Sequence, residues 1–438
     1  MLLMPQTHAV NILLTHAQRC VNFDIPAMYP GDYAANSAFG CTIYPVILNR
    51  TCIMIAMNST KLKPPTLVAD NDSLRSMLKS LLGQHHVAVD TESNSMHAYQ
   101  EQVCLIQFSI PNQDYLVDPL AFSSLSDLGP LFSNPQIEKI FHSAEYDIMC
   151  LKRDFGFTFH NLFDTRIASR TLGRKRSGLR DLIAAEFNTE IDKRYQRSNW
   201  GKRPLPDQWL AYARLDTYYL IPLRHRLYAA LQEAGRLEEA LEASEYITRI
   251  QPHKNGFDPH GFWRIRNTRE LAPQQLAILR RLYLYRDSQA KRMDRPPFKV
   301  MGDRTLYDLA AAAPDRIETL SEIHGMTPGQ IRRFGEGILE AIRQGKNDSI
   351  PRRPRSNHLD DKIIERYEAL HDWRKRTARE KKVDSDIILP REMLMDIAKS
   401  TPRSMDALRQ VMSPLMHRAN SYGEMILQVL WGDNNFHE

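Results

Sequence analysis

Short apolar runs separated by turn residues dominate the pattern of hydrophobic and polar positions between residues 66 and 141. Such runs are typical of buried strands, and their closeness along the chain favours a sheet whose strands pair consecutively. A turn at Pro111 and Asn112 separates the second run from the third. The predicted strands are Val87–Asp90, Val103–Ile110, Tyr115–Val117 and Ile137–Phe141.

Apolar residues at helical spacing precede and follow these strands. The predicted helices are Ser73–Leu82, Ala144–Phe155, Ser177–Glu186 and Asp207–Tyr228, with a further helix that runs to about Ile250. Residues 161–173 predict a turn and then a helix, with Asp164 as the cap at its start. Strands followed by helices indicate an α/β fold, in which ligands gather at the strand ends.

Acidic residues follow two of the predicted strands. Asp90 and Glu92 are two residues apart, so on a strand both side chains point to the same side. Asp147 lies on the helix after the fourth strand, where a carboxylate alone would more often face water. Tyr212 and Asp216 are four residues apart on a predicted helix and therefore share one face.

These five residues together have a chemical rationale. Hydrolysis of a phosphodiester needs an activated water and cations that neutralise charge on the attacking and leaving oxygens. Four carboxylates, Asp90, Glu92, Asp147 and Asp216, could hold two divalent cations through oxygen ligands, for which Mg²⁺ and Mn²⁺ are suited. The hydroxyl of Tyr212 could orient the water, because a phenol stays protonated at neutral pH.

Other residues in this region are candidates for substrate binding. His142 follows the fourth strand, where it either binds substrate or metal or has only a structural hydrogen bond. Residues 193–205 are basic and aromatic, a mixture suited to phosphates and bases. In that stretch Lys202 and Arg203 are candidate contacts, and Trp200 either contacts substrate or anchors the loop to the core.

Beyond residue 268 the pattern is helical, and it repeats without a gap at an offset of 88 residues. The offset matches Tyr285 with Trp373 and Gly335 with Gly423. Matching apolar and glycine positions predict two copies of one small helical domain. We expect the first copy to present a basic surface, extended by a basic linker, that attracts nucleic acid. The residues are Arg280, Arg281, Arg286, Lys291, Arg292, Arg295, Lys299, Arg332 and Arg333, with Arg352, Arg353 and Arg355 in the linker.

The composition narrows the function further. The 438 residues carry a net charge of +6, which favours an anionic partner, and nucleic acid is the first expectation. The five cysteines lack zinc-ligand spacing, which favours a reducing compartment. The sequence contains neither an apolar run of about 18 residues nor a secretory signal, so we expect a cytoplasmic protein without membrane contact.

The motifs resemble those of ribonuclease D, a family of the DEDD exonuclease superfamily in its tyrosine-containing branch. The resemblance lies in V-A-V-D-T-E with Asp90 and Glu92, in F-H-S-A-E-Y-D-I with Asp147, and in Y-A-R-L-D with Tyr212 and Asp216. It extends from about Thr66 to Glu233. The helical repeats resemble the HRDC domain, through L-Y-D-L-A and I-H-G-M-T in the first copy.

The resemblance implies a ribonuclease H-like fold, a mixed sheet flanked by helices, followed by two small all-α HRDC-like domains. It also implies a 3′–5′ exoribonuclease that releases 5′-mononucleotides, with tRNA precursors as the suggested substrate. Asp90, Glu92 and Asp216 would ligate the metal on the nucleophile side, Asp90 and Asp147 the metal on the leaving-group side, and Tyr212 would position the water. A DNA exonuclease of the same superfamily and a non-catalytic nucleic-acid-binding scaffold are the alternatives.

We expect a monomer with six segments. These are an N-terminal extension at 1–62, an exonuclease domain at 63–250, a linker at 251–267, a first HRDC-like domain at 268–346, a basic linker at 347–358 and a second HRDC-like domain at 359–438.

Overall fold

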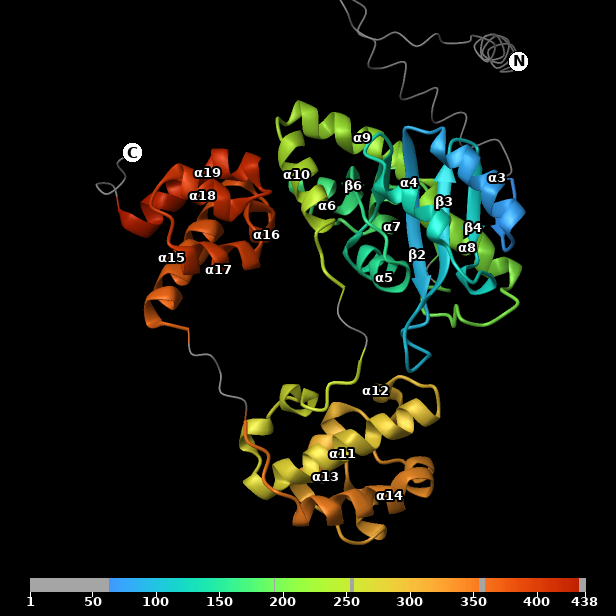
Figure 1. Ribbon diagram of the computed structural model, residues 1–438, viewed down its shortest axis with the longest axis vertical. Coiled ribbons are helices and arrows are strands. Elements are labelled where there is room, and N and C mark those ends of the chain that lie inside the picture. The colour runs from blue at the N-terminus through green and yellow to red at the C-terminus, as the bar shows by residue number, and fades with distance from the viewer. Residues whose placement is uncertain (1–62, 193, 253–255, 354–358, 433–438) are drawn as a thin grey trace, which may run out of the picture. The chain divides into compact units, whose positions relative to one another are not determined.

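The computed structural model describes residues 63–192, 194–252, 256–353 and 359–432 (Figure 1). The expectation for residues 1–62 lies outside the described residues, as does Arg355. Within the described parts of the chain, no helix is both long enough and apolar enough to cross a bilayer.

A six-stranded mixed sheet forms the centre of the N-terminal part, with the strand order β1-β4-β3-β2-β5-β6. The strands are β1 (Thr66–Val68), β2 (His86–Ser93), β3 (Val103–Ile110), β4 (Gln113–Val117), β5 (Glu138–Phe141) and β6 (Leu162–Asp164). β2, β3 and β4 pair antiparallel in chain order, as the apolar runs predict. β1 pairs parallel with β4, and β5 pairs parallel with both β2 and β6.

Helices cover both faces of this sheet (Figure 1). The helices are α3 (Asn71–Leu82), α4 (Gly129–Ser133), α5 (Glu145–Phe155), α6 (Thr165–Thr171), α7 (Leu179–Phe187), α8 (Asp207–Tyr218), α9 (Leu220–Glu233) and α10 (Leu237–Ile247). On one face, Val87 and Val89 of β2 join a core with α3 and α5. On the other face, Leu105 of β3 packs with Tyr212 of α8. The alternation along β2 therefore directs Asp90 and Glu92 towards the α8 face.

Two predictions from the apolar pattern were incomplete. β1 and β6 were missed, because three residues are too few to show an alternating pattern. The single helix predicted over 207–228 is in fact two helices that meet at Tyr219. Pro222 explains the break, because proline lacks the N–H that would continue the ladder and its ring would clash with the carbonyl four residues earlier. In the first turn of α9 the missing N–H costs nothing.

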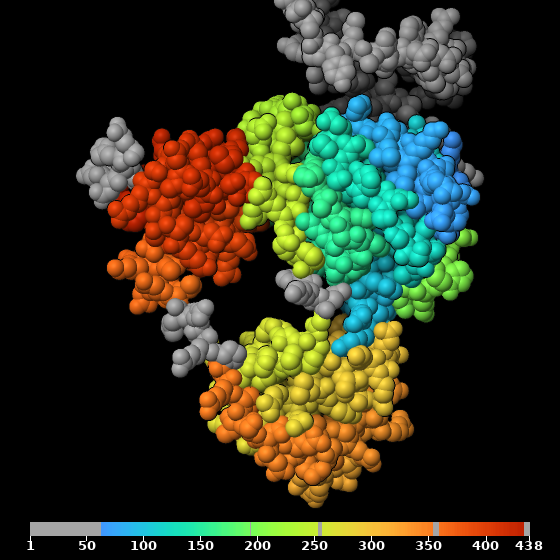
Figure 2. All heavy atoms as spheres, in the orientation of Figure 1, coloured from blue at the N-terminus to red at the C-terminus, as the bar shows by residue number. Residues whose placement is uncertain are grey.

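The C-terminal helices form two hydrophobic cores that repeat as predicted. The atoms of the two copies are coloured yellow to orange and orange to red in Figure 2. The first contains α11 (Pro273–Arg292), α12 (Pro297–Val300), α13 (Asp303–Ala312) and α14 (Pro328–Asn347), and Phe262 and Ile265, in the expected linker, pack into it. The second contains α15 (Asp361–Lys381), α16 (Ser385–Ile388), α17 (Arg391–Ser400), α18 (Met405–Met412) and α19 (Met416–Trp431). The offset of 88 residues also relates the first residues of the helices in the two copies. It maps α11 onto α15, α12 onto α16, α13 onto α17 and α14 onto α19.

One buried arginine occupies the same place in both copies and corrects the predicted basic surface. Arg286 is 7% exposed, and its Nη1 donates to the carbonyl oxygen of Met301 at 3.0 Å. Its counterpart Arg374 donates to the carbonyl of Leu389 at 2.8 Å, again 88 residues on. Arg286 is therefore a structural residue in the helical core, not part of a surface for nucleic acid.

Two further members of that predicted surface are already paired. Arg280 and Arg281 both form ion pairs with Asp348, at 3.1 Å and 2.5 Å. The remaining members of the predicted basic surface within the first copy are exposed, and their contact with nucleic acid stays a prediction. They are Lys291, Arg292, Arg295, Lys299, Arg332 and Arg333.

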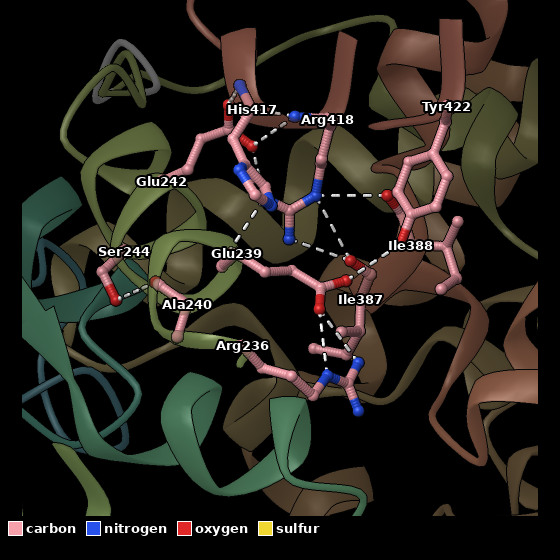
Figure 3. A network of polar contacts seen from close by, with 10 residues as sticks. All are labelled: Arg236, Glu239, Ala240, Glu242, Ser244, Ile387, Ile388, His417, Arg418 and Tyr422. Carbon is pink, nitrogen blue, oxygen red and sulfur yellow. Dashed lines mark hydrogen bonds and ion pairs between the residues drawn. The ribbon is translucent and has the colours of Figure 1, made fainter. Parts of the chain in front are cut away.

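A buried polar network joins α10 to the second helical copy (Figure 3). Arg418 of α19 is 1% exposed, pairs with Glu242 at 2.6 Å and donates to the carbonyl of Glu239 at 3.0 Å. Its other nitrogens donate to the carbonyl oxygens of Ile387 and Ile388. A buried guanidinium is tolerated only when it is paired in this way. The second copy is thus attached to the sheet-containing part by specific polar contacts.

Candidate active site

Two carboxylates of the candidate site come from β2 and two residues come from α8, which packs on the same face of the sheet. Asp90 lies opposite Gln107 of β3, and Glu92 lies opposite Leu105. Tyr212 contacts this face and is 7% exposed. Asp216 follows Tyr212 by one helical turn, so both side chains leave α8 on one side.

The fourth carboxylate, Asp147, comes from the first turn of α5 and is buried. The side chain of Thr91, between the two acidic residues of β2, points to the opposite face of the sheet. Its hydroxyl donates to Oδ1 of Asp147 at 2.5 Å. Thr91 therefore connects the strand that supplies Asp90 and Glu92 to the helix that supplies Asp147.

Asp164 fixes the position of that helix, and its predicted role as a helix cap is confirmed. At the end of β6 its Oδ1 accepts hydrogen bonds from the backbone N–H groups of Arg166 and Ile167, at 2.8 and 3.1 Å, which caps α6. The same carboxylate accepts from the N–H groups of Ser143 and Ala144, at 3.2 and 2.7 Å, just before α5. One buried side chain thus holds the start of two helices.

Asp164→Ala is expected to lower the free energy of unfolding by roughly 3–5 kcal/mol, because four backbone N–H groups lose their acceptor in a buried place. Urea unfolding followed by circular dichroism measures the loss. The matched control is Asp70→Ala, which removes the exposed cap of α3 and should have a much smaller effect. Equal losses in the two variants would contradict the double-cap role.

The clustered carboxylates repel one another in a place with little water. Burial raises the pKa of Asp90 well above its usual value, and the charges of Asp147, Asp216 and Glu92 raise it further. Burial, together with Asp216 and Asp147, also raises the pKa of Glu92. Burial raises the pKa of Asp147 to about 7. Asp147, Asp216 and Glu92 are therefore all near enough to Asp90 for their charges to raise its pKa.

The residues of this region line a cavity of about 330 Å³ that includes Asp90, Glu92, Tyr212 and Asp216. Its volume lies within the range of ligand pockets, roughly 300–1,000 Å³. Among the described residues, no group of three or more His, Cys, Asp or Glu side chains already has the spacing of a metal site. The four carboxylates, here named the acidic cluster, offer oxygen donors of the type that hard divalent cations prefer.

The residues predicted to bind substrate have different positions. His142 lines the cavity, and its Nδ1 lies 2.9 Å from Oγ1 of Thr165. Trp200 is fully buried against Tyr212 and Trp209, so its ring offers no surface for a base and anchors the loop. Arg203 is bound to the carboxylate of Asp118, which indicates a structural role. Lys202 is exposed and stays a prediction.

The sequence interpretation missed several polar residues that line the same cavity, among them two arginines and a glutamine. These three are Arg166, Arg180 and Gln196. Arg166 directly follows Thr165, and Arg180 lies in the stretch S-G-L-R-D-L at 177–182; both positions fall between Thr66 and Glu233, the range of the family resemblance. The family resemblance of this region could have drawn attention to the two arginines. Spacing along the chain alone could not place them beside the acidic cluster.

Comparison with known proteins agrees with this geometry. Residues 65–232 match the 3′–5′ exonuclease family, and residues 275–342 and 364–430 each match the HRDC domain. The fold and site therefore define a 3′–5′ exonuclease of the DEDD class with two HRDC domains, and the fold class predicted from the sequence is confirmed.

Ribonuclease D of Gluconacetobacter diazotrophicus is 30% identical over 281 residues, which are 64% of this chain and 71% of that protein. Ribonuclease D of Acidiphilium cryptum is 30% identical over 298 residues, 67% of this chain and 76% of that protein. The chain belongs to the ribonuclease D family and is, by that membership, an exoribonuclease. The exosome complex exonuclease RRP6 of Saccharomyces cerevisiae is 33% identical over 302 residues, but the chain spans only 41% of its length.

Solved structures show the same architecture. The catalytic core of RRP6 from Trypanosoma brucei is 27% identical and matches with a TM-score of 0.57, over 65% of this chain and 80% of that one. Ribonuclease D of Escherichia coli matches with a TM-score of 0.60 over 85% of this chain and all of that one. At 22% identity this second match supports the fold only.

Proposed function

We propose that the protein hydrolyses RNA from the 3′ end to 5′-mononucleotides with the help of two divalent cations, Mg²⁺ or Mn²⁺. Asp90, Glu92 and Asp216 would hold one cation, and Asp90 and Asp147 the other. When bound, such cations neutralise charge on the phosphate oxygens and promote ionisation of a water molecule. The carboxylates supply the oxygen ligands and fix where the scissile phosphate lies.

The observation that supports this proposal most is that Asp90 and Glu92 of β2 and Asp216 of α8 line one cavity. Asp147 of α5 is hydrogen-bonded to Thr91, which lies between the two acidic residues of β2 and lines the same cavity. Burial, and after it the neighbouring carboxylates, raises the pKa of Asp90 and of Glu92, and a bound cation would offset this cost of ionisation. A site that served only to bind RNA would be lined by basic side chains and not by a group of carboxylates, because carboxylates repel phosphates.

Two further assignments belong to the proposal. The segments at 63–250, 268–346 and 359–438 would act as catalytic domain and two auxiliary RNA-binding domains, in a monomer. Precursors of tRNA would be the substrate, because structured RNA offers both a 3′ end and a duplex body for the exposed basic residues of the first helical copy.

The direct test compares a tRNA precursor with a DNA strand of the same sequence, both carrying labelled nucleotides within the strand. Each is incubated with the protein in magnesium and in chelator. Release of labelled 5′-mononucleotides from the RNA in magnesium alone would support the proposal. Equal or faster release from DNA would favour the DNA exonuclease alternative. Hydrolysis that persists in chelator would contradict the role of the cations.

Tyr212→Phe is expected to lower kcat by roughly ten- to a hundredfold with little change in KM or in the affinity for magnesium. Burial and the charges of Asp216, Glu92 and Asp90 raise the pKa of Tyr212, so its hydroxyl stays protonated and acts as a hydrogen-bond donor. Phenylalanine keeps the ring contacts with Tyr195 and Trp200. Weaker magnesium binding in calorimetry would instead make the tyrosine a support for the ligands.

A further inference from the structure

Two arginines line the cavity of the acidic cluster, and the proposed reaction gives neither of them a role. Arg166 is the second residue of α6, and Arg180 is the second residue of α7. Both side chains are exposed. Two separate helices therefore bring guanidinium groups to the wall of a cavity whose other polar residues include Asp90, Glu92 and Asp216.

Neither arginine is neutralised by a carboxylate among the residues that the structure describes. Nη1 of Arg166 donates to the hydroxyl of Ser143 at 3.1 Å, a neutral partner that orients the group without cancelling its charge. Arg180 has no hydrogen bond or ion pair from its side chain within the described chain. By contrast, Arg153 and Arg224 of the same domain both pair with carboxylates. Asp192, also at the cavity, pairs with Arg194.

The charge of the substrate gives these two groups a purpose. A nucleic acid carries one negative charge for each nucleotide, so a strand that ends at the acidic cluster brings several phosphates close to carboxylates. Cations held by the cluster would neutralise the scissile phosphate, but the next phosphate along the strand would lie near uncompensated negative charge. A cavity of about 330 Å³ has room for a terminal nucleotide, which places the next phosphate at its rim.

We propose that Arg166 and Arg180 bind the phosphodiester immediately 5′ of the scissile linkage and so hold the 3′ end of the RNA in register with the acidic cluster. Guanidinium groups bind phosphate oxygens through two parallel hydrogen bonds, which fixes orientation as well as position. Both are positioning residues. The proposal rests on the proposed function, because it takes the acidic cluster as the place where the strand is cut.

The experiment uses the full chain with Arg166→Gln, Arg180→Gln and the double change. Arg249→Gln is the matched control, since Arg249 is exposed, has no ion pair among the described residues and does not line the cavity. Each single change should raise KM for an RNA oligonucleotide roughly tenfold, with kcat altered less than about threefold, because binding is lost equally in ground and transition states. The slope of log KM against the logarithm of the salt concentration should fall by about 0.7 for each phosphate contact removed. Lysine at either position should restore that salt dependence.

A modified substrate identifies the phosphate. The modified RNA carries one uncharged methylphosphonate at the linkage next to the terminal one. The KM of the wild type for this RNA should be as high as the KM of the double variant for unmodified RNA. The double variant should not distinguish the modified RNA from the unmodified one. A double variant that still loses affinity for the modified RNA would overturn the proposal, as would KM values equal to those of the Arg249 control.

Binding without turnover separates this proposal from the proposed function. Fluorescence anisotropy in chelator measures RNA affinity whether or not the strand can be cut. If the wild type fails to hydrolyse RNA in magnesium, the proposed function is wrong. If it hydrolyses RNA but the double variant binds the unmodified and modified strands as the wild type does, only the role of the arginines is wrong.

Discussion

Asp90→Asn is expected to lower kcat for RNA hydrolysis by roughly 10²–10⁴-fold, the largest effect of any single change at the site. Asp90 is the carboxylate that both proposed cations would share, and burial together with the charges of Asp147, Asp216 and Glu92 raises its pKa well above its usual value. Metal-assisted charge stabilisation is worth several kcal/mol, and 1.36 kcal/mol corresponds to a tenfold change in rate. Single-turnover hydrolysis of an RNA labelled near its 3′ end measures the loss.

The control for this variant is Glu145→Gln. Glu145 lies in the first turn of α5, two residues before Asp147, but its side chain is exposed and does not line the cavity. Its change should leave kcat within about twofold of the wild type, because exposed charges are screened. Circular dichroism should show that both variants stay folded. Turnover by Asp90→Asn at the wild-type rate would remove Asp90 from the proposed cation site.

Asp147→Asn is expected to make the protein more stable in chelator at pH 8, by about 2–4 kcal/mol. Burial raises the pKa of Asp147 to about 7, so the folded state pays for an ionised group that the unfolded chain ionises near pH 3.8. The cost of full ionisation is about 4 kcal/mol and is shared with Asp90. Asparagine removes the charge and still accepts the hydrogen bond from Thr91.

The sign of this effect sets its pH window. A carboxyl whose folded pKa is raised stabilises the fold fully below pH 3.8, and this contribution is lost as pH rises through 7. The difference between variant and wild type should therefore vanish near pH 4 and grow up to about pH 8. Urea unfolding at four pH values in chelator measures it, and saturating magnesium should reduce or reverse the difference. A difference that does not change with pH would show that Asp147 is not strained by ionisation.

The apolar runs predicted the longer strands correctly, and β3 has the bounds Val103–Ile110 that the pattern predicts. The same runs could not reveal β1 or β6, whose three residues pair with strands distant in the chain. The helical repeat was readable because its offset of 88 residues is a property of the residue order. The burial of Arg286 could not be predicted from the sequence. An arginine on an amphipathic helix has the same spacing whether its guanidinium group reaches water or a buried carbonyl oxygen.

Residue types and their spacing along the chain were enough to place Asp90 with Glu92 on one side of a strand and Tyr212 with Asp216 on one face of a helix. The exonuclease class came from the resemblance of these motifs to ribonuclease D. Residue types and spacing could not tell that Trp200 is enclosed in the core, that Asp164 caps two helices, or that Arg166 and Arg180 stand beside the carboxylates. The first depends on how the loop packs against β3, β4 and α8, and the other two depend on where β6, α6 and α7 come to lie beside the residues of β2 and α5. Contacts between segments that are distant along the chain follow from packing, which local periodicity does not encode.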